Sequence, residues 1–328
     1  MSTANTKISV VVIGKDEEKT LDRIFENFKE LDRQVEGKSQ LIYVDSNSTD
    51  GSLYIAKEFR KQNAELNVSI IKIQGNPNAA IARNVGIEHI DSQSKYIFFL
   101  DGDIIFDVEF VIKAISIMEK NERIASVCGT IMDSFETTDT KGMVRPAARA
   151  AKGNVVLWHG GNFVTGKSII EQVGMFDDNL VKHQDIDYSF RMRNKGYILW
   201  MIEQRLGTHY TISYMNRRQM LNDLKGGKYI SSGLLFKKYC VSKRYVDMLK
   251  SISGILFRCF VVCCAVLSIF FYPFGVIGVL GFVAVLSKTK TARGETVWSR
   301  ALSFMSGIQF IIGLFKVRKK PIYEIQVI

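Results

Sequence analysis

The chain has 328 residues, of which 47% are hydrophobic, 23% are charged and only 4 are proline. This composition excludes a disordered, collagenous or low-complexity protein, and the length suits one large unit or two smaller ones. The net charge of +11, taken alone, indicates a nucleic acid or a membrane surface as partner. The charge is unevenly placed: residues up to Glu203 include 25 basic and 29 acidic side chains, whereas the rest include 19 and 4.

The last third of the chain combines this basic excess with the most apolar segments. Residues 253–287 form an apolar stretch of 35 residues, interrupted by Arg258 and by a turn signal around Pro273. A membrane span needs about 20 residues, so either a tight hairpin or one long span fits. Residues 301–315 are also apolar and are followed by Lys and Arg, which the positive-inside rule keeps in the cytoplasm. The sequence therefore predicts a helical, membrane-associated tail.

The first 130 residues alternate short β-branched runs with helical periods, which is typical of a mostly parallel sheet flanked by helices. An amphipathic helix is expected between the first two runs, because its apolar positions step by three or four. The predicted strands are residues 8–13, 40–44, 68–73, 96–100 and 124–127, and the apolar helix positions are Leu21, Ile24, Phe25, Phe28 and Leu31. Further helices are expected after Gly51 and after Asn78.

The periodicity then breaks and returns. We expect a loop at residues 135–153, a strand and turn at 154–165, a helix at 184–195, a strand at 197–202 and a basic amphipathic linker helix at 216–250. The chain is thus expected to have three parts: an α/β domain at 1–215, a basic linker at 216–252, and a hydrophobic membrane-associated region at 253–328 that ends in a basic segment.

The cysteines and the N-terminus indicate a reducing compartment. The 5 cysteines form neither a CxxC pair nor a zinc-binding spacing. The first apolar run, residues 8–13, is short and is followed at once by Asp16, Glu17 and Glu18, which is unlike a signal peptide. We therefore expect reduced cysteines and a polar domain in the cytoplasm.

Polar side chains gather where the predicted strands end. Residues 14–16 follow the first strand, 45–47 the second and 101–103 the fourth. In an open α/β sheet the ligand crevice lies at the carboxyl ends of the strands. Three acidic strand ends at one edge therefore predict a binding site.

Asp101 and Asp103 are the most specific part of this pattern. Two carboxylates one residue apart in a loop suit a hard divalent cation, which prefers oxygen ligands and keeps substrate phosphate oxygens in its shell. The alternative is a plain turn, because Asp-Gly is a common turn signal.

Asp45 and Arg83 are candidate ligand-binding residues. Ser48, Thr49 and Asp50 after Asp45 suit helix capping, whereas Asp45 is not needed for a cap and could accept hydrogen bonds from a base or ribose. Arg83 stands near a helix start, where a guanidinium can stack on a base or bind phosphate. A merely solvated arginine is the alternative.

These pieces, in this order, resemble the family-two glycosyltransferases, whose nucleotide-sugar-binding domain has the Rossmann-like GT-A fold. The resemblance extends over about residues 8–210. Its matching segments are Asp45-Ser46-Asn47-Ser48-Thr49-Asp50-Gly51, Ala82-Arg83-Asn84, Asp101-Gly102-Asp103, Gly160-Gly161-Asn162 and Gln184-Asp185-Ile186-Asp187-Tyr188-Ser189-Phe190-Arg191.

The resemblance implies a role for each matched residue. Asp45 and Arg83 correspond to positions that hold the nucleobase, and Asp101 to one on the ribose side. Asp103 corresponds to the residue that binds Mg²⁺ or Mn²⁺ at the diphosphate. His209 corresponds to a position that often completes the metal shell, and a purely structural histidine is the alternative. Asp185 corresponds to the catalytic base. Asn162 and Trp158 would line the acceptor or sugar pocket, with a core position as the equal alternative for Trp158.

The residue chemistry agrees with Asp185 as the base. A base and a metal site are both required when an acceptor hydroxyl displaces a nucleoside diphosphate. Asp187 lies on another helix face and can pair with Arg191 at i,i+4, which leaves Asp185 near the helix N-terminus, where the dipole favours its ionised form. A simple N-cap is the alternative for Asp185.

Two departures from the family's usual residues and one missing segment limit what the resemblance implies about activity. Gln184 stands where the family usually has Glu, and residues 13–18 differ from the family's usual first loop. The Gln-x-x-Arg-Trp segment of processive polysaccharide synthases is absent after Asp185. Transfer of a single sugar is therefore expected.

The resulting hypothesis is a metal-dependent, inverting glycosyltransferase at the cytoplasmic face of the cell membrane. Its partners would be a nucleoside-diphosphate sugar, a lipid-linked or polysaccharide acceptor, and membrane lipids. A nucleotidyltransferase of similar fold is one alternative, although the first loop has only one glycine and Lys15. A non-catalytic basic protein that binds membranes or nucleic acid is the other. We expect no nucleic-acid partner, because the basic residues flank apolar segments and are not interleaved with exposed aromatic residues.

Overall fold

The computed structural model describes residues 8–36, 38–75, 77–135, 143–146, 148–211, 217–268, 276–278, 280, 283, 304–317 and 321–328. The chain divides into two compact units. The first consists of Met1–Asp178, Gln184–Thr211 and Pro321–Ile328, and the second of Asn179–His183 and Ile212–Lys320.

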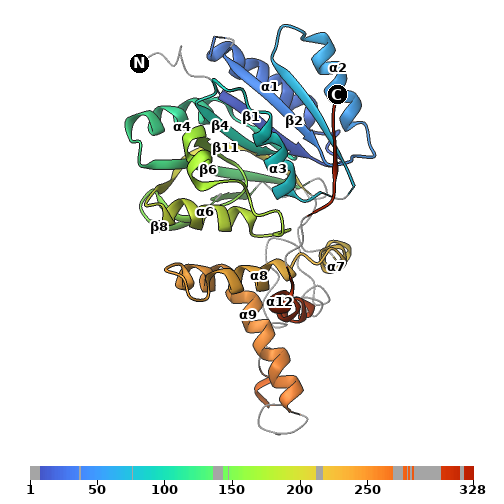
Figure 1. Cartoon of the computed structure of the whole chain (residues 1–328), viewed down its shortest axis with the longest axis vertical. Coiled ribbons are helices and arrows are strands. Elements are labelled where there is room, and N and C mark those ends of the chain that lie inside the picture. The colour runs from blue at the N-terminus through green and yellow to red at the C-terminus, as the bar shows by residue number, and fades with distance from the viewer. Residues whose placement is uncertain are drawn as a thin grey trace. The chain divides into compact units, whose positions relative to one another are not determined.

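In the described residues of the first unit, 12 strands form one mixed sheet (Figure 1). The order is β12-β3-β2-β1-β4-β10-β6-β11-β9-β8, with β5 paired to β11 and β7 paired to β6. β1 to β4 are parallel, as the sequence predicts. The strands are β1 (Ile8–Gly14), β2 (Ser39–Asp45), β3 (Val68–Gln74), β4 (Tyr96–Asp101), β5 (Ile104–Phe106), β6 (Ile124–Phe135), β7 (Met143–Pro146), β8 (Ala148–Lys152), β9 (Val155–His159), β10 (Phe163–Gly166), β11 (Ile198–Thr211) and β12 (Glu324–Val327).

Six helices pack around this sheet: α1 (Leu21–Gln34), α2 (Ser52–Gln62), α3 (Ala79–Glu88), α4 (Val108–Lys120), α5 (Lys167–Val173) and α6 (Gln184–Asn194). The five predicted apolar positions of α1 are buried in the core. α3 lies close to β1 because Gly86 has no side chain: a Cβ there would be 2.3 Å from Cγ1 of Val11. Nearly all the β1 and β2 residues are fully buried, so these two strands form the centre of the core.

The predicted loop at residues 135–153 is wrong for the described part of that segment. β7 pairs with β6, and β8 pairs with β9. β7 has four residues and ends in proline, and β8 consists of alanine, arginine and lysine, so neither contains a β-branched run and both depend on strand pairing. β11 is also longer than predicted, because it continues through Gly207 to Thr211 between its neighbours.

Residues 324–327 form the edge strand β12, which is antiparallel to β3. The pairing runs from Glu324 opposite Gln74 to Val327 opposite Ile71. The amide of Ile328 donates to the carbonyl of Ile70 at 2.9 Å, and Arg60 donates to the carbonyl of Ile328. The chain thus leaves the first unit after β11 and rejoins its sheet at the opposite edge.

The described helices of the second unit are α7 (Arg217–Lys225), α8 (Ile230–Tyr239), α9 (Tyr245–Leu267) and α12 (Met305–Phe315). The single linker helix predicted for residues 216–250 is wrong: the segment contains α7, α8 and the start of α9. A break falls at Gly227, whose φ of +64° is a left-handed conformation that glycine adopts readily.

Glycine contacts hold α8, α9 and α12 together. A Cβ on Gly233 of α8 would be 2.2 Å from the carbonyl oxygen of Phe310, and one on Gly313 of α12 would be 2.2 Å from that of Ile230. A Cβ on Gly307 would be 2.9 Å from backbone atoms of Cys259 on α9. Such close backbone approach at small residues is common where helices pack in membranes.

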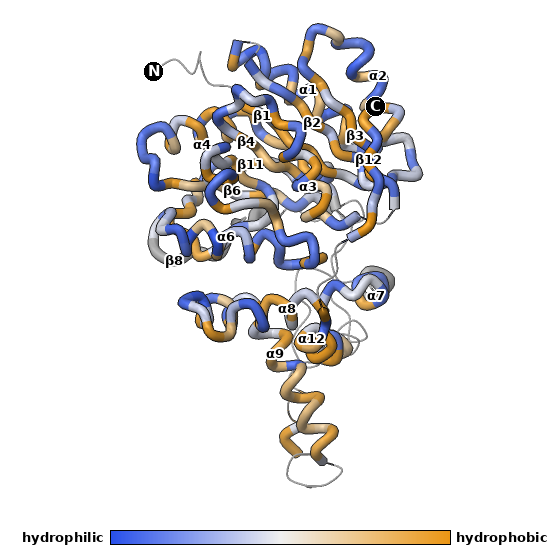
Figure 2. The backbone as a smooth tube through the Cα atoms, viewed as in Figure 1, coloured by the Kyte–Doolittle hydropathy of each residue, from blue (hydrophilic) through white to orange (hydrophobic). Residues whose placement is uncertain are grey.

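Among the described residues, α9 is the one helix long and apolar enough to cross a membrane. It has 23 residues, and Figure 2 shows apolar colour along most of its length. Phe257, Phe260, Val266 and Leu267 are exposed on it. The predicted turn around Pro273 lies outside the described residues, so the choice between a hairpin and a single span stays open.

Candidate functional site

The ends of β2, β1 and β4 bring the predicted acidic residues to one edge of the sheet. In the parallel register, Gly14 lies opposite Asp45 on one side, and Ile13 lies opposite Asp101 on the other. Gly102 donates its amide hydrogen to the carbonyl of Ile13 at 2.8 Å, so the loop after β4 folds against the end of β1. The sheet itself therefore places Asp45 and Asp101 on either side of the β1 end.

Two loops at this edge are bonded to each other through carboxylates. The amide of Thr49 donates to Oδ1 of Asp16 at 2.7 Å, and the amide of Gly51 donates to Oε2 of Glu18 at 2.7 Å. In return, the amide of Asp16 donates to Oγ of Ser48 at 2.9 Å. The unusual first loop is thus explained by structure: its acidic side chains fix the second loop. Ser48 and Thr49 serve this contact and are not caps of α2.

Asp45 is fully buried at the base of the second loop. Its carboxylate accepts from the hydroxyl of Tyr43 at 3.3 Å and from the amide of Ser48 at 3.1 Å. Both oxygens therefore help to hold the loop in place. The predicted contact of Asp45 with a nucleobase is not tested by these bonds and stays a prediction.

Asp101 is clamped by two residues from other parts of the chain. Arg83 donates from Nη2 to Oδ1 of Asp101 at 2.5 Å, and Asn162 donates from Nδ2 to Oδ2 at 2.9 Å. Oδ1 of Asn162 also accepts from the amide of Asp101 at 2.7 Å. Arg83 and Asn162, both predicted as substrate-binding residues, thus directly orient the predicted ribose-side carboxylate.

Arg83 is 1% exposed, so the alternative of a merely solvated arginine is wrong. Its Nε and Nη1 atoms are buried without a hydrogen-bond partner among the described residues. A Cβ on Gly161 would lie 2.1 Å from Nη2, so the guanidinium requires glycine at that position. This explains the Gly160-Gly161-Asn162 segment: it leaves room for Arg83 and supplies Asn162 to Asp101.

Asp103 and His209 meet at the same edge. Nε2 of His209 is 2.8 Å from Oδ2 of Asp103, and its Nδ1 is 2.9 Å from Oδ1 of Asp133. Burial disfavours the charged ring, but hydrogen bonds and charge from Asp103 and Asp133 raise the pKa of His209 overall. The structure therefore brings together the two predicted metal-site residues and adds Asp133, which the sequence analysis does not identify.

Glu17 is a second residue that the sequence analysis does not identify. Its side chain lies against Gly102, where a Cβ would be 3.1 Å from Cγ of Glu17. Burial, followed by the charges of Asp103 and Asp101, raises the pKa of Glu17 from 4.5 to about 8. The site thus concentrates negative charge around Asp103. In the sequence, the adjacent residues Glu17 and Glu18 after the first predicted strand are the signal that could have identified it.

Asp185 lies in the first turn of α6, as predicted, and is partly buried. Its Oδ1 accepts from the amide of Ile186 at 2.9 Å. Burial raises the pKa of Asp185, the charge of Arg83 opposes that rise, and the charge of Asp101 adds to it. The expectation that the helix dipole favours the ionised form is thus outweighed by burial. Asp185 thus responds electrostatically to Arg83 and Asp101, and its role as the base stays a prediction.

Two further residues of α6, Asp187 and Gln184, were singled out in the sequence. Asp187 accepts from Nε of Arg191 at 2.9 Å and is fully buried, which confirms the predicted i,i+4 pair. Gln184, the departure from the family pattern, has a buried Oε1 with no partner among the described residues. His159 and Trp158 pack beside this helix: the ring of Trp158 contacts Phe190 edge-on.

The donor set fits a divalent cation only in part. Among the described residues, no group of three or more His, Cys, Asp or Glu side chains is arranged to hold a metal ion. Asp103 and His209 offer one oxygen and one nitrogen, and Mg²⁺ or Mn²⁺ at a nucleotide site typically takes one or two protein carboxylates and substrate phosphates. The pair therefore suits a cation that arrives with a diphosphate.

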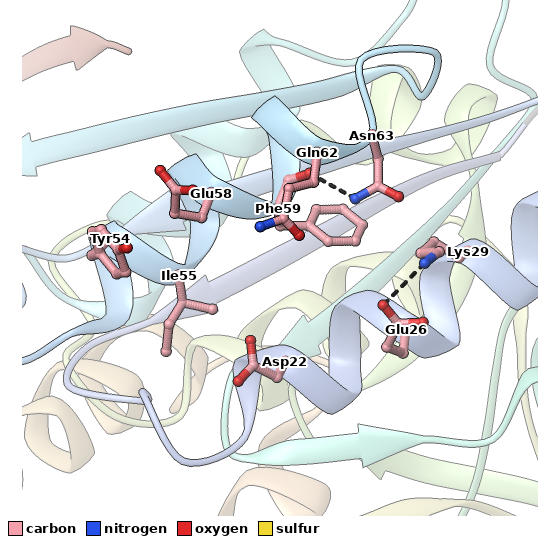
Figure 3. Close-up of a pocket in the computed structure, with 9 residues that line it drawn as sticks. All are labelled: Asp22, Glu26, Lys29, Tyr54, Ile55, Glu58, Phe59, Gln62 and Asn63. Atoms are coloured by element: carbon pink, nitrogen blue, oxygen red, sulfur yellow. Dashed lines mark hydrogen bonds and ion pairs between the residues drawn. The ribbon is translucent and has the colours of Figure 1, made fainter.

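A separate pocket lies between α1 and α2 (Figure 3), and no predicted site residue lines it. Its charged side chains are mostly acidic, and its one lysine, Lys29, is paired with Glu26 at 3.1 Å. It is lined by Asp22, Glu26, Lys29, Tyr54, Ile55, Glu58, Phe59, Gln62 and Asn63.

Residues 9–180, more than half of the chain, match the model of glycosyl transferase family 2. The chain belongs to this family. It is 25% identical over 179 residues to glycosyltransferase AglE of Haloferax volcanii, an alignment that covers 52% of this chain and 57% of that protein. The chain therefore matches little more than half the length of this curated relative.

Solved structures confirm the GT-A fold. Mannosyltransferase PcManGT from Pyrobaculum calidifontis, in complex with GDP-Man and Mn²⁺, superposes with a TM-score of 0.57 at 13% identity, covering 94% of this chain and 87% of that chain. TarS 1-349 from S. aureus, in complex with UDP-GlcNAc, superposes with a TM-score of 0.51 at 13% identity, covering 94% and 89%.

Proposed function

We propose that this protein transfers a single sugar from a nucleoside-diphosphate sugar to an acceptor hydroxyl, with inversion at the anomeric carbon. The observation that carries the proposal is the buried Arg83. Its guanidinium bonds to Asp101, on the predicted donor side, and its charge acts on Asp185, the predicted base. This electrostatic link between the two proposed sides supports the proposal, in a chain that belongs to a glycosyltransferase family.

Asp185 is the proposed base. A carboxylate whose pKa is raised by burial is a stronger base than a solvated one, and the charge of Arg83 opposes that rise. In the proposed step, Asp185 takes the proton of the acceptor hydroxyl, and the oxygen attacks the anomeric carbon. The bond to the diphosphate breaks on the opposite face, which inverts the configuration.

Asp45, Arg83, Asp101 and Asn162 are proposed to bind the donor, with Asp101 presenting its free edge. Its side chain is 35% exposed, whereas the Arg83 side chain behind it is 2% exposed. Arg83 and Asn162 thus fix the orientation of an accessible carboxylate, which suits hydrogen bonding to ribose hydroxyls.

Asp103 and His209 are proposed to hold Mg²⁺ or Mn²⁺. The cation would neutralise charge on the departing diphosphate. The Asp103 side chain is 34% exposed in front of His209, which is 8% exposed, so Asp103 is the accessible member of the pair. Mn²⁺ accompanies GDP-Man in the PcManGT structure, which supports the same type of cation here.

The proposed acceptor is lipid-linked or a polysaccharide, and the proposed location is the cytoplasmic face of the cell membrane. α9 is apolar and exposes Phe257 and Phe260, which suits lipid contact. Lys237, Lys238 and Lys243 precede it, and basic residues at a span end favour the cytoplasmic side.

Nothing in the site favours the nucleotidyltransferase alternative. Its phosphate-binding loop would follow β1, but the carboxylates of Asp16 and Glu18 occupy that loop and bind the backbone of residues 49–51.

The experiment that tests the proposal incubates membranes containing the protein with a panel of radiolabelled nucleotide sugars, with and without chelator. We expect labelled glycolipid or glycan from one donor, its loss with EDTA, and its return with Mn²⁺ or Mg²⁺. The same membranes containing the Asp185→Asn protein provide the control. Label transfer that is equal in both membranes would refute the proposal.

A further inference from the structure

Asp133 lies behind the proposed metal site and has no place in the function derived so far. Its side chain is 2% exposed, so neither solvent nor a nucleotide reaches it. Its Oδ1 is 2.9 Å from Nδ1 of His209, and the other ring nitrogen is 2.8 Å from Asp103. We propose that Asp133 is a positioning residue that acts through His209 on cation binding at Asp103. The inference rests on the proposed function, because it concerns the same cation.

The sheet register builds this arrangement from three strands. β11 runs parallel to β6, and His209 lies directly opposite Asp133. On its other side β11 pairs with β5, where His209 lies opposite Ile104, the residue after Asp103. The amide of Tyr210 donates to the carbonyl of Asp103 at 3.0 Å, which ties the loop to the strand. His209 is therefore held between two carboxylates by backbone pairing on both sides.

Gly207 permits this close pairing. A Cβ at Gly207 would be 2.5 Å from the carbonyl oxygen of Ile105 and 2.9 Å from Cα of Phe106. Any side chain there would push β5 away from β11, and Asp103 would move with it.

The identity of the hydrogen-bond partner determines which nitrogen remains for a cation. A neutral imidazole has one protonated nitrogen and one lone-pair nitrogen, and the partner of the protonated nitrogen selects the tautomer. A carboxylate only accepts, and each ring nitrogen of His209 faces one in the structure. If Nε2 gives its lone pair to a cation, the single proton of the neutral ring lies on Nδ1, where Asp133 accepts it. Carboxylate partners of this kind orient metal-binding histidines, and their loss typically costs about 10- to 100-fold in metal affinity.

The other histidines show that this pairing is particular to His209. The chain has 4 histidines. His89 contacts the carbonyl of Val85, His183 contacts the hydroxyl of Ser232, and His159 contacts a hydroxyl and a carbonyl. The histidine that reaches the site edge is thus the one whose contacts are two carboxylates.

The test measures Mn²⁺ affinity of the full-length protein in detergent, by the electron paramagnetic resonance signal of free Mn²⁺, with GDP and in parallel with UDP. Four proteins are compared with the wild type: Asp133→Asn, His209→Gln, the double variant, and the control Asp32→Asn. Asp32 is a half-buried carboxylate that accepts from Ser39 at the start of β2, at the opposite end of the strands. Asp133→Ser is a second replacement in case the amide prevents folding, which the unfolding temperature reports.

We expect Asp133→Asn to raise the dissociation constant of Mn²⁺ about tenfold or more, whereas Asp32→Asn leaves it unchanged. In the His209→Gln background the Asp133 replacement should have no further effect, because Asp133 acts through the ring. A merely structural role would weaken binding equally in both backgrounds, and that result would overturn the inference, as would full Mn²⁺ affinity in Asp133→Asn. If the wild type binds no Mn²⁺ with either nucleotide, the metal part of the proposed function fails as well. Normal Mn²⁺ binding by the wild type with an inert Asp133 leaves the proposed function intact.

Discussion

Arg83 and Asp101 form an ion pair with one buried and one accessible end. Nη2 of Arg83 lies 2.5 Å from Oδ1 of Asp101, and the arginine side chain is 2% exposed against 35% for the aspartate. A buried guanidinium has lost its hydration, so its remaining field acts strongly on nearby carboxylates. Asp185 is one of them, because the charge of Arg83 opposes the rise in its pKa. One cation therefore serves two parts of the proposed site.

Replacing Arg83 by Gln should lower sugar transfer by about 100-fold or more, because Asp101 loses its partner and Asp185 loses the charge that favours its ionised form. The pKa of Asp185 should rise further, so the acidic limb of the pH–rate profile should move to higher pH. Steady-state kinetics across pH would measure both effects. Arg33→Gln, which removes an exposed arginine paired with Glu30, is the control. An unshifted acidic limb in Arg83→Gln would contradict the coupling.

Gly161→Ala should displace the Arg83 guanidinium, because the new Cβ would lie 2.1 Å from Nη2 in its present position. We expect transfer to fall at least tenfold with little change in secondary structure by circular dichroism. Gly254→Ala is the control, since a Cβ there meets nothing within 4 Å. If Gly161→Ala retains full activity, the Arg83 side chain can adopt another conformation, and its bond to Asp101 is not required for transfer.

Asp185→Asn should abolish transfer and leave donor affinity within about threefold of wild type, because the amide fills the same volume but cannot accept a proton. Isothermal titration with the active nucleotide sugar and a single-turnover assay would separate the two effects. Asp187→Asn should behave differently: it weakens the buried pair with Arg191 and should lower the unfolding temperature. Loss of donor binding in Asp185→Asn would show that Asp185 binds the donor and is not the base.

Glu17→Gln should stabilise the protein at neutral pH in chelator. The pKa of Glu17 is raised from 4.5 to about 8, so the folded state keeps a proton that the unfolded state releases. The wild type should therefore lose stability as pH rises from about 4.5 to 8, and the glutamine variant should lack this loss. After allowance for partial exposure we expect a difference of about 1–2 kcal/mol at pH 8. Unfolding temperatures at pH 5 and pH 8 would measure it, and an equal difference at both pH values would refute it.

The sequence predicts β1 to β4 and α1 well because their residues are buried through their own periodicity. β7, β8 and β12 were not predicted, since each is a strand of only four or five residues that pairs with a neighbouring strand. The linker was predicted as one helix, but it is interrupted twice: at Gly227, whose backbone is left-handed, and between the end of α8 at Tyr239 and the start of α9 at Tyr245.

The candidate site was likewise predictable in part from the sequence and in part only from the folded structure. Asp45, Asp101 and Asp103 could be placed at one edge from strand ends alone, because parallel strands share a direction. Asp133 could not, since it occurs inside a strand and becomes relevant only when β11 pairs with β6. The pKa of Asp185 was misjudged because the helix dipole is visible in sequence, whereas the burial that outweighs it is a tertiary property.

The edge strand β12 has a practical consequence for producing a water-soluble fragment. Simple truncation after Thr211 would remove β12 and leave the hydrogen-bonding groups of β3 open, and an uncovered sheet edge promotes aggregation. A fragment that joins Thr211 to Pro321 through a flexible glycine-rich linker would keep this edge covered and omit the apolar helices. The linker has to reach from β11 to β12, seven strands away in the sheet, which is about 33 Å at the usual strand spacing. Solubility screens of this protein should therefore begin with internal deletions.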